Sequence, residues 1–368
     1  MSRRKRKQKM ELDELRKKID SLDDEILRLL NQRYETVVKI GSWKKNKSGA
    51  IYVPEREKAV LDRLCSQNHG PMSNATLRSV YREIMSGALS LEYPLRVAYL
   101  GPEATYTHHA ALSKFGRSVG YVPKTNLREV FSAVASGHAE YGCVPVENST
   151  EGVVSHTLDM FLEWPDVMIC AEINMQIHHS LLSLSGISQI RKVYAHPQTF
   201  GQCRCWFREN MPGVELLETS SNTRACELAA KDPEAAAVAS PVAADVYGLA
   251  SLRDRIEDNP DNTTRFLVIG NQKKMAAPTG TDKTSVCFSI RDRVGALYDC
   301  LLPFKTEELT LSMIESRPSR AKNWEYHFFI DILGHKDDEP VKKALSDLES
   351  MTSAMRILGS YPRGNEAE

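Results

Sequence analysis

Apolar residues recur at intervals of mostly three and four along the first part of the chain. This period matches one face of an α-helix, so we predict a long amphipathic helix from Leu12 to Lys47, with no Pro or Gly before Gly41. At 1.5 Å per residue it would span roughly 54 Å. One small domain cannot cover such a stripe, so we expect a second copy of the chain to pack against it. The stripe consists of Leu12, Leu15, Ile19, Leu22, Ile26, Leu29, Val37 and Ile40.

Two cations lie on the inward face of this helix. Arg33 occupies a position where the heptad spacing predicts an apolar residue, and Lys44 lies about 20° away around the helix at 100° per residue. Buried cations need anionic partners. Either a carboxylate such as Glu57 neutralises them or they bind an acidic ligand, and the spacing alone leaves both interpretations open.

Two shorter helices are predicted at 54–64 and from about 74 to 91, which completes a helical domain over residues 1–93 without strands. The basic segment 1–10 precedes the apolar stripe. Basic ends of this kind are usually disordered and solvated, so we expect a disordered tail rather than a nucleic-acid-binding arm.

Short apolar runs alternate with helical stretches in the following segment, 95–272, which is typical of an α/β domain. Polar residues gather just after the ends of several strands, where open parallel sheets bind their ligands. The strands are predicted at 95–100, 141–146, 193–195, 235–239 and 267–270.

The last of these strands is preceded by the triplet Thr264-Arg265-Phe266, which follows a predicted turn at 258–262. A hydroxyl can donate to a leaving oxygen, and a guanidinium can hold a carboxylate through two parallel hydrogen bonds. Alone, the triplet is weak evidence for a site, and the structural interpretation, with Thr placed for β-propensity and Arg placed on the surface, is favoured. Its meaning depends on the other motifs.

The C-terminal segment, 283–361, follows a linker that contains Pro278 and Gly280. Its pattern predicts strand, helix, two strands, helix and strand. This βαββαβ order is typical of a ferredoxin-like α+β domain. The tail after Tyr361 is expected to be disordered.

Composition narrows the classes of function. The 368 residues carry 48 basic and 48 acidic side chains, so no acidic macromolecular partner such as nucleic acid is indicated. Apolar runs fall short of the ~18 residues of a membrane span, and there is no secretory signal, so we expect a cytoplasmic protein.

Eight scattered cysteines without a Cys-x-x-Cys pair predict reduced thiols and no metal site. Structural roles are expected for His196 and for the pairs His108-His109 and His178-His179, because no metal-ligand spacing accompanies them.

The cations of the helical domain follow a specific pattern. The order and spacing of Arg16, Arg33, Lys44, Arg56 and Glu57 resemble those of the all-helical chorismate mutases. The resemblance implies a dimer that encloses a dicarboxylate, with one arginine of the first helix crossing to the other subunit's site. It also implies that the four cations hold the carboxylates, that Lys44 donates to the ether oxygen, and that Glu57 binds the ring hydroxyl. The rearrangement needs no nucleophile, only a compact conformer and stabilised charge on the breaking ether.

Three positions bear on the fine hydrogen bonding of this site. Val53 stands where an Asp is common in the family, Ala88 where a Ser is frequent, and Glu92 where Gln or Glu occurs. Glu92 would face the ether oxygen and would have to be protonated to donate to it. Alternatively, Glu92 ends its helix in solvent before Pro94.

The central segment carries several motifs that together resemble prephenate dehydratase. By this resemblance the segment folds into two α/β lobes around a cleft, similar to periplasmic binding proteins. Thr264 would be the main catalytic group, Asn148 and Gln202 would assist at the leaving hydroxyl, and Arg265 would hold a carboxylate together with the turn Ser221-Asn222-Thr223. Threonine is a weak acid, but one hydrogen bond can suffice because loss of carbon dioxide and hydroxide makes an aromatic ring. The motifs are Gly101-Pro102, Thr105-Tyr106-Thr107, Glu147-Asn148, His196-Pro197-Gln198 with Gln202, Ser221-Asn222-Thr223 and Thr264-Arg265-Phe266.

The C-terminal segment carries Gly295-Ala296-Leu297 and Glu315-Ser316-Arg317-Pro318, which resemble the motifs of the ACT domain attached to prephenate dehydratases. That domain binds phenylalanine between paired copies.

Together the resemblances imply a bifunctional enzyme that converts chorismate to prephenate and prephenate to phenylpyruvate. It would be inhibited by phenylalanine, would be a homodimer or a larger homo-oligomer, and would use no metal or organic cofactor. One alternative is an arogenate dehydratase with mutase activity. Another is a non-catalytic, amino-acid-sensing binding protein, which the presence of Thr264 and the four cations argues against.

Overall fold

The computed structural model describes residues 3–45, 54–92, 94–150, 152–271, 275–290, 293–318 and 326–364, and the side chains of its first helix from 11 to 43. Three helices open the chain: α1 (Arg3–Lys45), α2 (Pro54–Gln67) and α3 (Asn74–Glu92). The predicted helical region is therefore confirmed. Among the helices that the structure describes, none has an apolar stretch long enough to cross a membrane.

The basic segment at the start of the chain is helical from Arg3 onward, which corrects our prediction of disorder. Arg, Lys and Gln have favourable helix propensities, and a helix that already exists extends without a new nucleation cost.

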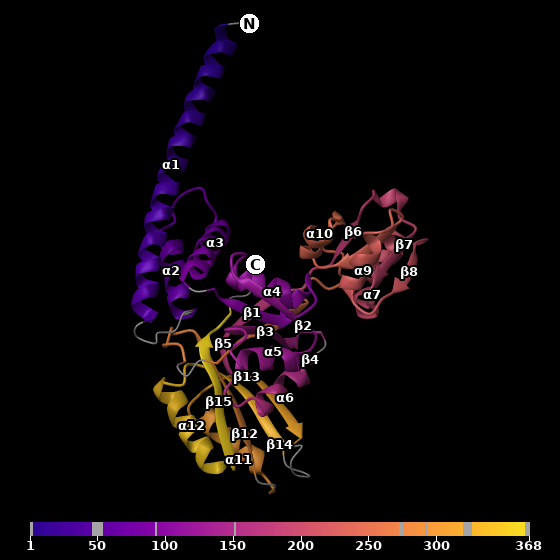
Figure 1. The fold of residues 1–368 in the computed structure, drawn as a ribbon. Helices are drawn as coiled ribbons and strands as arrows, with labels where there is room; N and C mark the ends of the chain where they lie inside the picture. Colours follow the sequence, from indigo (N-terminus) through magenta and orange to yellow (C-terminus); the bar gives the residue numbers. More distant parts are fainter. Residues whose placement is uncertain are drawn as a thin grey trace.

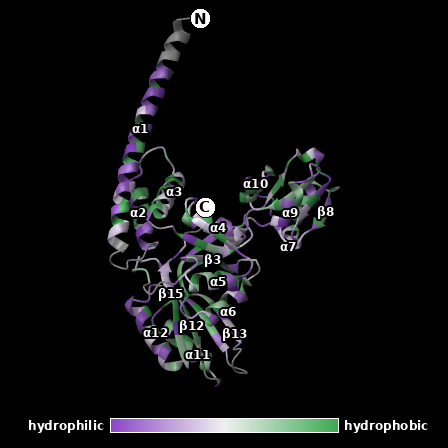
Figure 2. Cartoon of the chain, in the orientation of Figure 1, coloured by the Kyte–Doolittle hydropathy of each residue, from purple (hydrophilic) through white to green (hydrophobic). Residues whose placement is uncertain are grey.

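Helix α1 extends far beyond α2 and α3 (Figure 1), and most of its apolar stripe is exposed among the residues that the structure describes. Ile19 is 57% exposed and Ile26 is 53% exposed. Figure 2 shows hydrophobic positions at intervals along the largely hydrophilic helix α1. Its C-terminal part packs on α3, where Tyr34 Oη donates to the carbonyl of Ile84 at 3.1 Å. Gly87 permits this approach, because a Cβ there would lie 2.6 Å from Tyr34 Oη.

The α/β segment forms two lobes (Figure 1). Lobe one contains a mixed sheet in the order β2-β1-β3-β11-β5, with β4 paired to β3. Its strands are β1 (Arg96–Leu100), β2 (Gly120–Lys124), β3 (Tyr141–Asn148), β4 (Gly152–Val153), β5 (Met168–Gln176) and β11 (Thr263–Gly270), and its helices are α4 (Tyr106–Phe115), α5 (Leu127–Ala135) and α6 (Ser155–Glu163).

Lobe two contains the sheet β10-β6-β9-β7-β8. The all-alanine-and-valine strand β9 lets α9 pack closely, with Ala225 and Ala229 against Ala237 in one core. The strands are β6 (Ser180–Ser183), β7 (Lys192–Ala195), β8 (Glu215–Glu218), β9 (Ala235–Ala239) and β10 (Ala250–Arg253), and the helices are η1 (Ile187–Gln189), α7 (Pro197–Gln202), α8 (Arg204–Asn210), α9 (Asn222–Ala229) and α10 (Val242–Tyr247).

Two chain segments cross between the lobes. The first leads from β5 to β6 and the second leads from β10 back to β11. They run side by side, since Ile177 N donates to Asn262 O at 2.7 Å and Ile256 N donates to His179 O at 3.0 Å. The predicted two-lobed organisation is confirmed, and this crossover is the connection between the two lobes.

The C-terminal segment forms an antiparallel sheet in the order β13-β14-β12-β15. Helices α11 and α12 pack on one face. The other face shares a core with lobe one, in which Phe329 and Leu358 pack with Ile169 and Leu267. The elements are β12 (Asp282–Ser289), α11 (Ala296–Thr306), β13 (Leu311–Pro318), β14 (Tyr326–Leu333), α12 (Glu339–Met351) and β15 (Ala354–Pro362).

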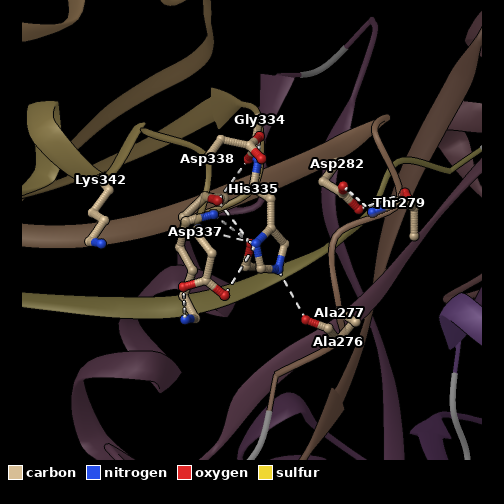
Figure 3. A network of polar contacts seen from close by, with 12 residues as sticks. Ala276, Ala277, Thr279, Asp282, Gly334, His335, Asp337, Asp338 and Lys342 are labelled. Atoms are coloured by element: carbon tan, nitrogen blue, oxygen red, sulfur yellow. Dashed lines mark hydrogen bonds and ion pairs between the residues drawn. The ribbon is translucent and has the colours of Figure 1, made fainter. Parts of the chain in front are cut away.

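The predicted linker is anchored to the C-terminal segment (Figure 3). His335 is fully buried and its Nδ1 accepts from Asp337 N at 3.1 Å, so Nε2 carries the hydrogen that it donates to Ala276 O at 3.0 Å. Thr279 N donates to Asp282 Oδ2 at 2.7 Å. These contacts fix the path of the chain from lobe one into β12.

Candidate active sites

Thr264 and Asn148 face each other on the paired strands β11 and β3. Asn148 Nδ2 donates to Thr264 Oγ1 at 2.8 Å and to Asn262 Oδ1 at 2.9 Å. Asn148 Oδ1 accepts from Thr150 N at 2.9 Å. Both hydrogens of the amide are therefore engaged within the protein. The amide of Asn148 thus contacts the hydroxyl of Thr264 directly, and the assistance of Asn148 at the leaving hydroxyl stays a prediction.

The half-buried Thr264 hydroxyl is arranged as a donor. Its oxygen already accepts from Asn148, and no described residue accepts a hydrogen bond from it. Its hydrogen is thus available to a ligand. Asn262, which supports Asn148, is 3% exposed. Sequence reasoning missed it because it ends a run of Asp, Asn and Pro that predicts only a turn.

Arg265 does not lie in this site. Successive residues of a strand point to opposite faces, so its side chain leaves β11 on the face away from Thr264. Its Nε donates to Glu172 Oε2 at 2.8 Å, its Nη1 to Asp331 Oδ2 at 2.5 Å and its Nη2 to Tyr361 Oη at 3.1 Å. With the guanidinium occupied and buried, the prediction that Arg265 holds a substrate carboxylate is corrected.

The residues around Arg265 form a buried polar cluster between lobe one and the C-terminal sheet. Lys283 Nζ donates to Glu172 Oε2 at 2.8 Å, and Ser285 Oγ lies 2.7 Å from Tyr361 Oη. Burial alone would raise the pKa of Glu172, but Arg265 and Lys283 together hold that pKa below its usual value. The signal for this cluster was the presence of Glu172 and Asp331 inside apolar strands, where a charge requires a partner.

Gln202 lies at the end of α7 in lobe two, beside the crossover. Its Oε1 is 2.7 Å from His179 Nε2, and its backbone carbonyl accepts from Asp258 N at 2.7 Å. Thr264 and Gln202 are thus held by different lobes, one on each side of the crossover.

The turn Ser221-Asn222-Thr223 joins the first turns of α7 and α9. Ser221 Oγ caps α9 by accepting from Arg224 N at 3.1 Å. Asn222 Oδ1 accepts from His196 N at 2.9 Å, and Asn222 Nδ2 donates to Thr199 Oγ1 at 2.8 Å. Two helix N-termini therefore converge at one edge of lobe two, a location that favours an anion. Asn222 organises this edge through its own hydrogen bonds.

In the helical region, Arg33 is half-buried and its Nη1 is enclosed without a hydrogen-bond partner among the described residues. Glu92 comes from the end of α3 and packs on α1, since a Cβ at Gly41 would lie 2.6 Å from Glu92 Cγ. Oε1 of Glu92 is buried. Glu92 thus lies against the helix that carries Arg33, which contradicts the alternative of a carboxylate in solvent.

The other predicted mutase residues are more dispersed. Glu57 Oε2 lies 3.5 Å from Lys114 Nζ of α4, and Arg56 is exposed on the first turn of α2. The side chain of Arg16 is 67% exposed and pairs with Asp13 at 3.7 Å. The side chain of Lys44 and all of Val53 lie outside the described residues, whereas Ala88 is buried in α3.

The two C-terminal motifs lie at the start of α11 and along β13. Gly295 precedes α11 with φ +79°, and Ala296 is buried while Leu297 is half-buried. Arg317 donates to both carboxylate oxygens of Asp159 on α6, at 2.9 and 3.0 Å. The second motif therefore contacts lobe one directly. Its other residues are Glu315, half-buried, and the exposed Ser316 and Pro318.

Comparison with known proteins gives matches over most of the chain. The sequence family of chorismate mutase type II matches residues 15–93, and that of prephenate dehydratase matches residues 97–274. A bifunctional chorismate mutase/prephenate dehydratase from Aquifex aeolicus is 48% identical over 358 residues, covering 96% of this chain and 98% of the relative. A protein of the same name from Stutzerimonas stutzeri is 45% identical over 360 residues, with the same coverage. A crystal structure of prephenate dehydratase from Arthrobacter aurescens in complex with L-Phe has a TM-score of 0.68 and 33% identity, covering 74% of this chain and 91% of that one.

Proposed function

This chain belongs to the family of bifunctional chorismate mutase/prephenate dehydratases, and on that premise we propose which of its residues perform the two reactions. The enzyme rearranges chorismate to prephenate and converts prephenate to phenylpyruvate with loss of water and carbon dioxide. The observation that carries the assignment of the dehydratase site is the contact between Asn148 Nδ2 and Thr264 Oγ1, which leaves the hydroxyl hydrogen available to a substrate.

In the dehydratase reaction, Thr264 donates to the departing hydroxyl of prephenate. Asn148 positions Thr264 and, by donating to its oxygen, makes the hydroxyl a better donor. Gln202 donates to the leaving group from lobe two. A substrate carboxylate binds at the converging ends of α7 and α9, where the Ser221-Asn222-Thr223 turn lies. Arg265 has no part in substrate binding, because its guanidinium is occupied by Glu172, Asp331 and Tyr361.

The test of this function is to give chorismate to the purified full-length enzyme and to follow prephenate and phenylpyruvate over time. Prephenate should rise first and phenylpyruvate should follow. A parallel assay with arogenate separates the two possible substrates, because arogenate carries an amino group in place of the keto group. Efficient conversion of arogenate together with slow turnover of prephenate would reverse the assignment.

The proposed mutase site combines Arg33 and Lys44, from the C-terminal part of α1, with Arg56 and Glu57, from the first turn of α2. Arg16 lies 17 positions before Arg33, about 26 Å away along the helix at 1.5 Å per residue. That separation is too long for Arg16 to reach the same site. We therefore assign Arg16 to the site of a second copy, whose α1 covers the exposed apolar stripe in a homodimer or a larger homo-oligomer.

Glu92 is the proposed neighbour of the ether oxygen of chorismate. An ionised carboxylate has no proton to donate to that oxygen and repels the charge that develops there. We therefore expect Glu92→Gln, whose amide NH₂ can donate, to raise mutase kcat/KM above that of the wild type. The measurement is the rate of prephenate formation from chorismate by both proteins. Equal values of kcat/KM would place Glu92 outside the site.

We divide the chain into a helical mutase domain at 1–93, a dehydratase domain at 95–272 and an ACT domain at 283–361. Phenylalanine inhibits the dehydratase through the ACT domain. The known complex of a similar prephenate dehydratase with L-Phe supports a phenylalanine effector. Two contacts could carry its effect to lobe one: the Arg317–Asp159 pair, and the buried cluster around Arg265, the neighbour of Thr264. The shared apolar core means that deleting this domain would uncover part of lobe one, so point variants are the better test.

Phenylalanine inhibition should weaken in Gly295→Ala. Gly295 has φ +79°, and a Cβ in the left-handed region costs roughly 1–2 kcal/mol, so the start of α11 should shift. The concentration of phenylalanine for half-inhibition should rise about tenfold, the equivalent of about 1.4 kcal/mol. Gly280→Ala is the matched control, because Gly280 has φ +82° and open space at its Cβ but lies outside both motifs. Equal shifts in the two variants would contradict the assigned site.

A further inference from the structure

A chain of three side chains connects the two lobes across the crossover. Tyr106 comes from the first turn of α4 in lobe one, His179 from the crossover, and Gln202 from the end of α7 in lobe two. Tyr106 Oη lies 2.6 Å from His179 Nδ1, and His179 Nε2 lies 2.7 Å from Gln202 Oε1. Tyr106 Oη is also 2.9 Å from the carbonyl of His178. The contacts of His179 with Tyr106 and Gln202 join side chains only.

The imidazole of His179 is held in place from several directions. The side chain is 1% exposed. Its backbone N donates to Glu257 Oε2 at 2.8 Å, and its backbone carbonyl accepts from Ile256 N at 3.0 Å. Glu257 Oε1 in turn lies 2.6 Å from His178 Nδ1. The crossover therefore presents the ring to Tyr106 and Gln202 in one orientation.

Counting hydrogens leaves two consistent arrangements. Burial lowers the pKa of His179, so the ring is neutral and carries one N–H. In the first, the Tyr106 hydroxyl donates to the carbonyl of His178, Nδ1–H donates to Tyr106, and the bare Nε2 requires the amide NH₂ of Gln202. In the second arrangement, Tyr106 donates to Nδ1 at the shorter distance of 2.6 Å instead of to the carbonyl of His178 at 2.9 Å, and Nε2–H donates to Gln202 Oε1.

The second arrangement is the one that suits the reaction. It agrees with Gln202 Oε1 lying against His179 Nε2. It also leaves the NH₂ of Gln202 directed away from the ring, and no described residue accepts a hydrogen bond from that nitrogen. A departing hydroxide needs a donor, which an amide oxygen turned outward could not supply.

We propose that His179 and Tyr106 are positioning residues of the dehydratase, which fix the orientation of the Gln202 amide so that its NH₂ faces the substrate. This inference rests on the proposed role of Gln202 as a donor to the leaving hydroxyl. It replaces the purely structural role that sequence reasoning expected for His179. It also makes the chain a link between the lobes, since Tyr106 belongs to lobe one and Gln202 to lobe two.

The test begins with Tyr106→Phe in the full-length enzyme. Without the hydroxyl, Nδ1 has no donor and the ring can adopt either tautomer, so Gln202 can turn its oxygen to the substrate. The kcat of the dehydratase should fall about tenfold, with KM nearly unchanged. This loss is smaller than the roughly 10²–10³-fold loss on removal of a whole donor, because Gln202 is still present and only its orientation is less well fixed. Tyr121→Phe is the matched control, because it removes another hydroxyl from lobe one, one that donates to the carbonyl of Gly116. It should leave dehydratase kcat unchanged.

A double variant separates this inference from the role of Gln202 itself. Gln202→Leu alone should lower kcat strongly, and adding Tyr106→Phe should lower it no further, because Tyr106 acts only through Gln202. Full activity of Gln202→Leu would overturn the proposed role of Gln202. A low activity that falls another tenfold in the double variant would overturn the positioning role while leaving Gln202 as a catalytic group.

The tautomer can be read without any activity measurement. In a ¹⁵N-histidine spectrum of the wild-type enzyme, with His179 assigned by comparison with His179→Asn, Nε2 should have the shift of a protonated nitrogen and Nδ1 that of an acceptor. In Tyr106→Phe the two shifts should move toward each other as the tautomers mix. A protonated Nδ1 in the wild type would overturn the proposal.

Discussion

Thr264→Ala should lower dehydratase kcat by about 10²–10³, the usual cost of removing one preorganised donor, while mutase activity stays near normal. The hydroxyl of Thr264 is the group at this site whose hydrogen has no acceptor among the described residues, and Asn148 donates to its oxygen at 2.8 Å. The proposed mutase residues lie on α1–α3, outside lobe one. The measurement is the rate of phenylpyruvate formation from prephenate, together with the rate of prephenate formation from chorismate.

Thr264→Ser is the matched control for this prediction, because it keeps the hydroxyl and the acceptor for Asn148. It should retain activity within about tenfold of the wild type, which corresponds to about 1.4 kcal/mol. Loss of both reactions in Thr264→Ala with the fold intact would show that the two sites are not separate. Equal losses in the Ala and Ser variants would show that the methyl group or the local packing matters, rather than the hydroxyl.

Arg265→Met should destabilise the protein by about 3–5 kcal/mol, because it leaves buried carboxylates without their partner. Glu172 is 4% exposed and Asp331 is 1% exposed, and both lie within hydrogen-bond distance of the guanidinium. The cluster joins lobe one to the C-terminal sheet, so both should unfold at lower urea concentration. The measurement is the unfolding midpoint by circular dichroism, together with dehydratase KM for prephenate.

Arg128→Met is the matched control, since Arg128 also pairs with a carboxylate, Glu163 at 2.6 Å, but its side chain is 60% exposed. Exposed pairs contribute about 0–1 kcal/mol, so its midpoint should barely move. If Arg265→Met were as stable as the wild type but had a strongly raised KM for prephenate, Arg265 would be a substrate ligand after all and our structural assignment would be wrong.

The Arg265 case shows where sequence reasoning reaches its limit. The triplet Thr264-Arg265-Phe266 was recognised, and its strand was predicted, because an apolar run after a turn is a local signal. Two adjacent side chains of a strand cannot share a face, however, and the pairing of β11 with β3 and β5 decides which face meets substrate. Thr264 and Arg265 are therefore adjacent in the motif but lie on opposite faces of β11.

Asn148 and His179 show the converse, in which the fold joins what the sequence separates. Asn148 is 116 positions from Thr264 in the chain, and Tyr106 is 73 positions from His179. No local pattern encodes such contacts. Motif resemblance predicted Asn148 as a site residue, and only the structure shows that its amide donates to Thr264 Oγ1, the contact on which its proposed positioning role rests. Nothing in the sequence distinguished His179 from a structural histidine.

Local patterns were enough to predict the long helix of the first segment, the alternation of strands and helices, and the motifs of both reactions, because periodicity and turn residues act over a few positions. The tertiary structure decided which polar groups are available to ligands and which satisfy one another. The fold places Arg265 in the buried cluster with Glu172 and Asp331, and it leaves the hydroxyl hydrogen of Thr264 available to a substrate. The reason is that strand register and domain packing set these partners, and both depend on residues far apart in the chain.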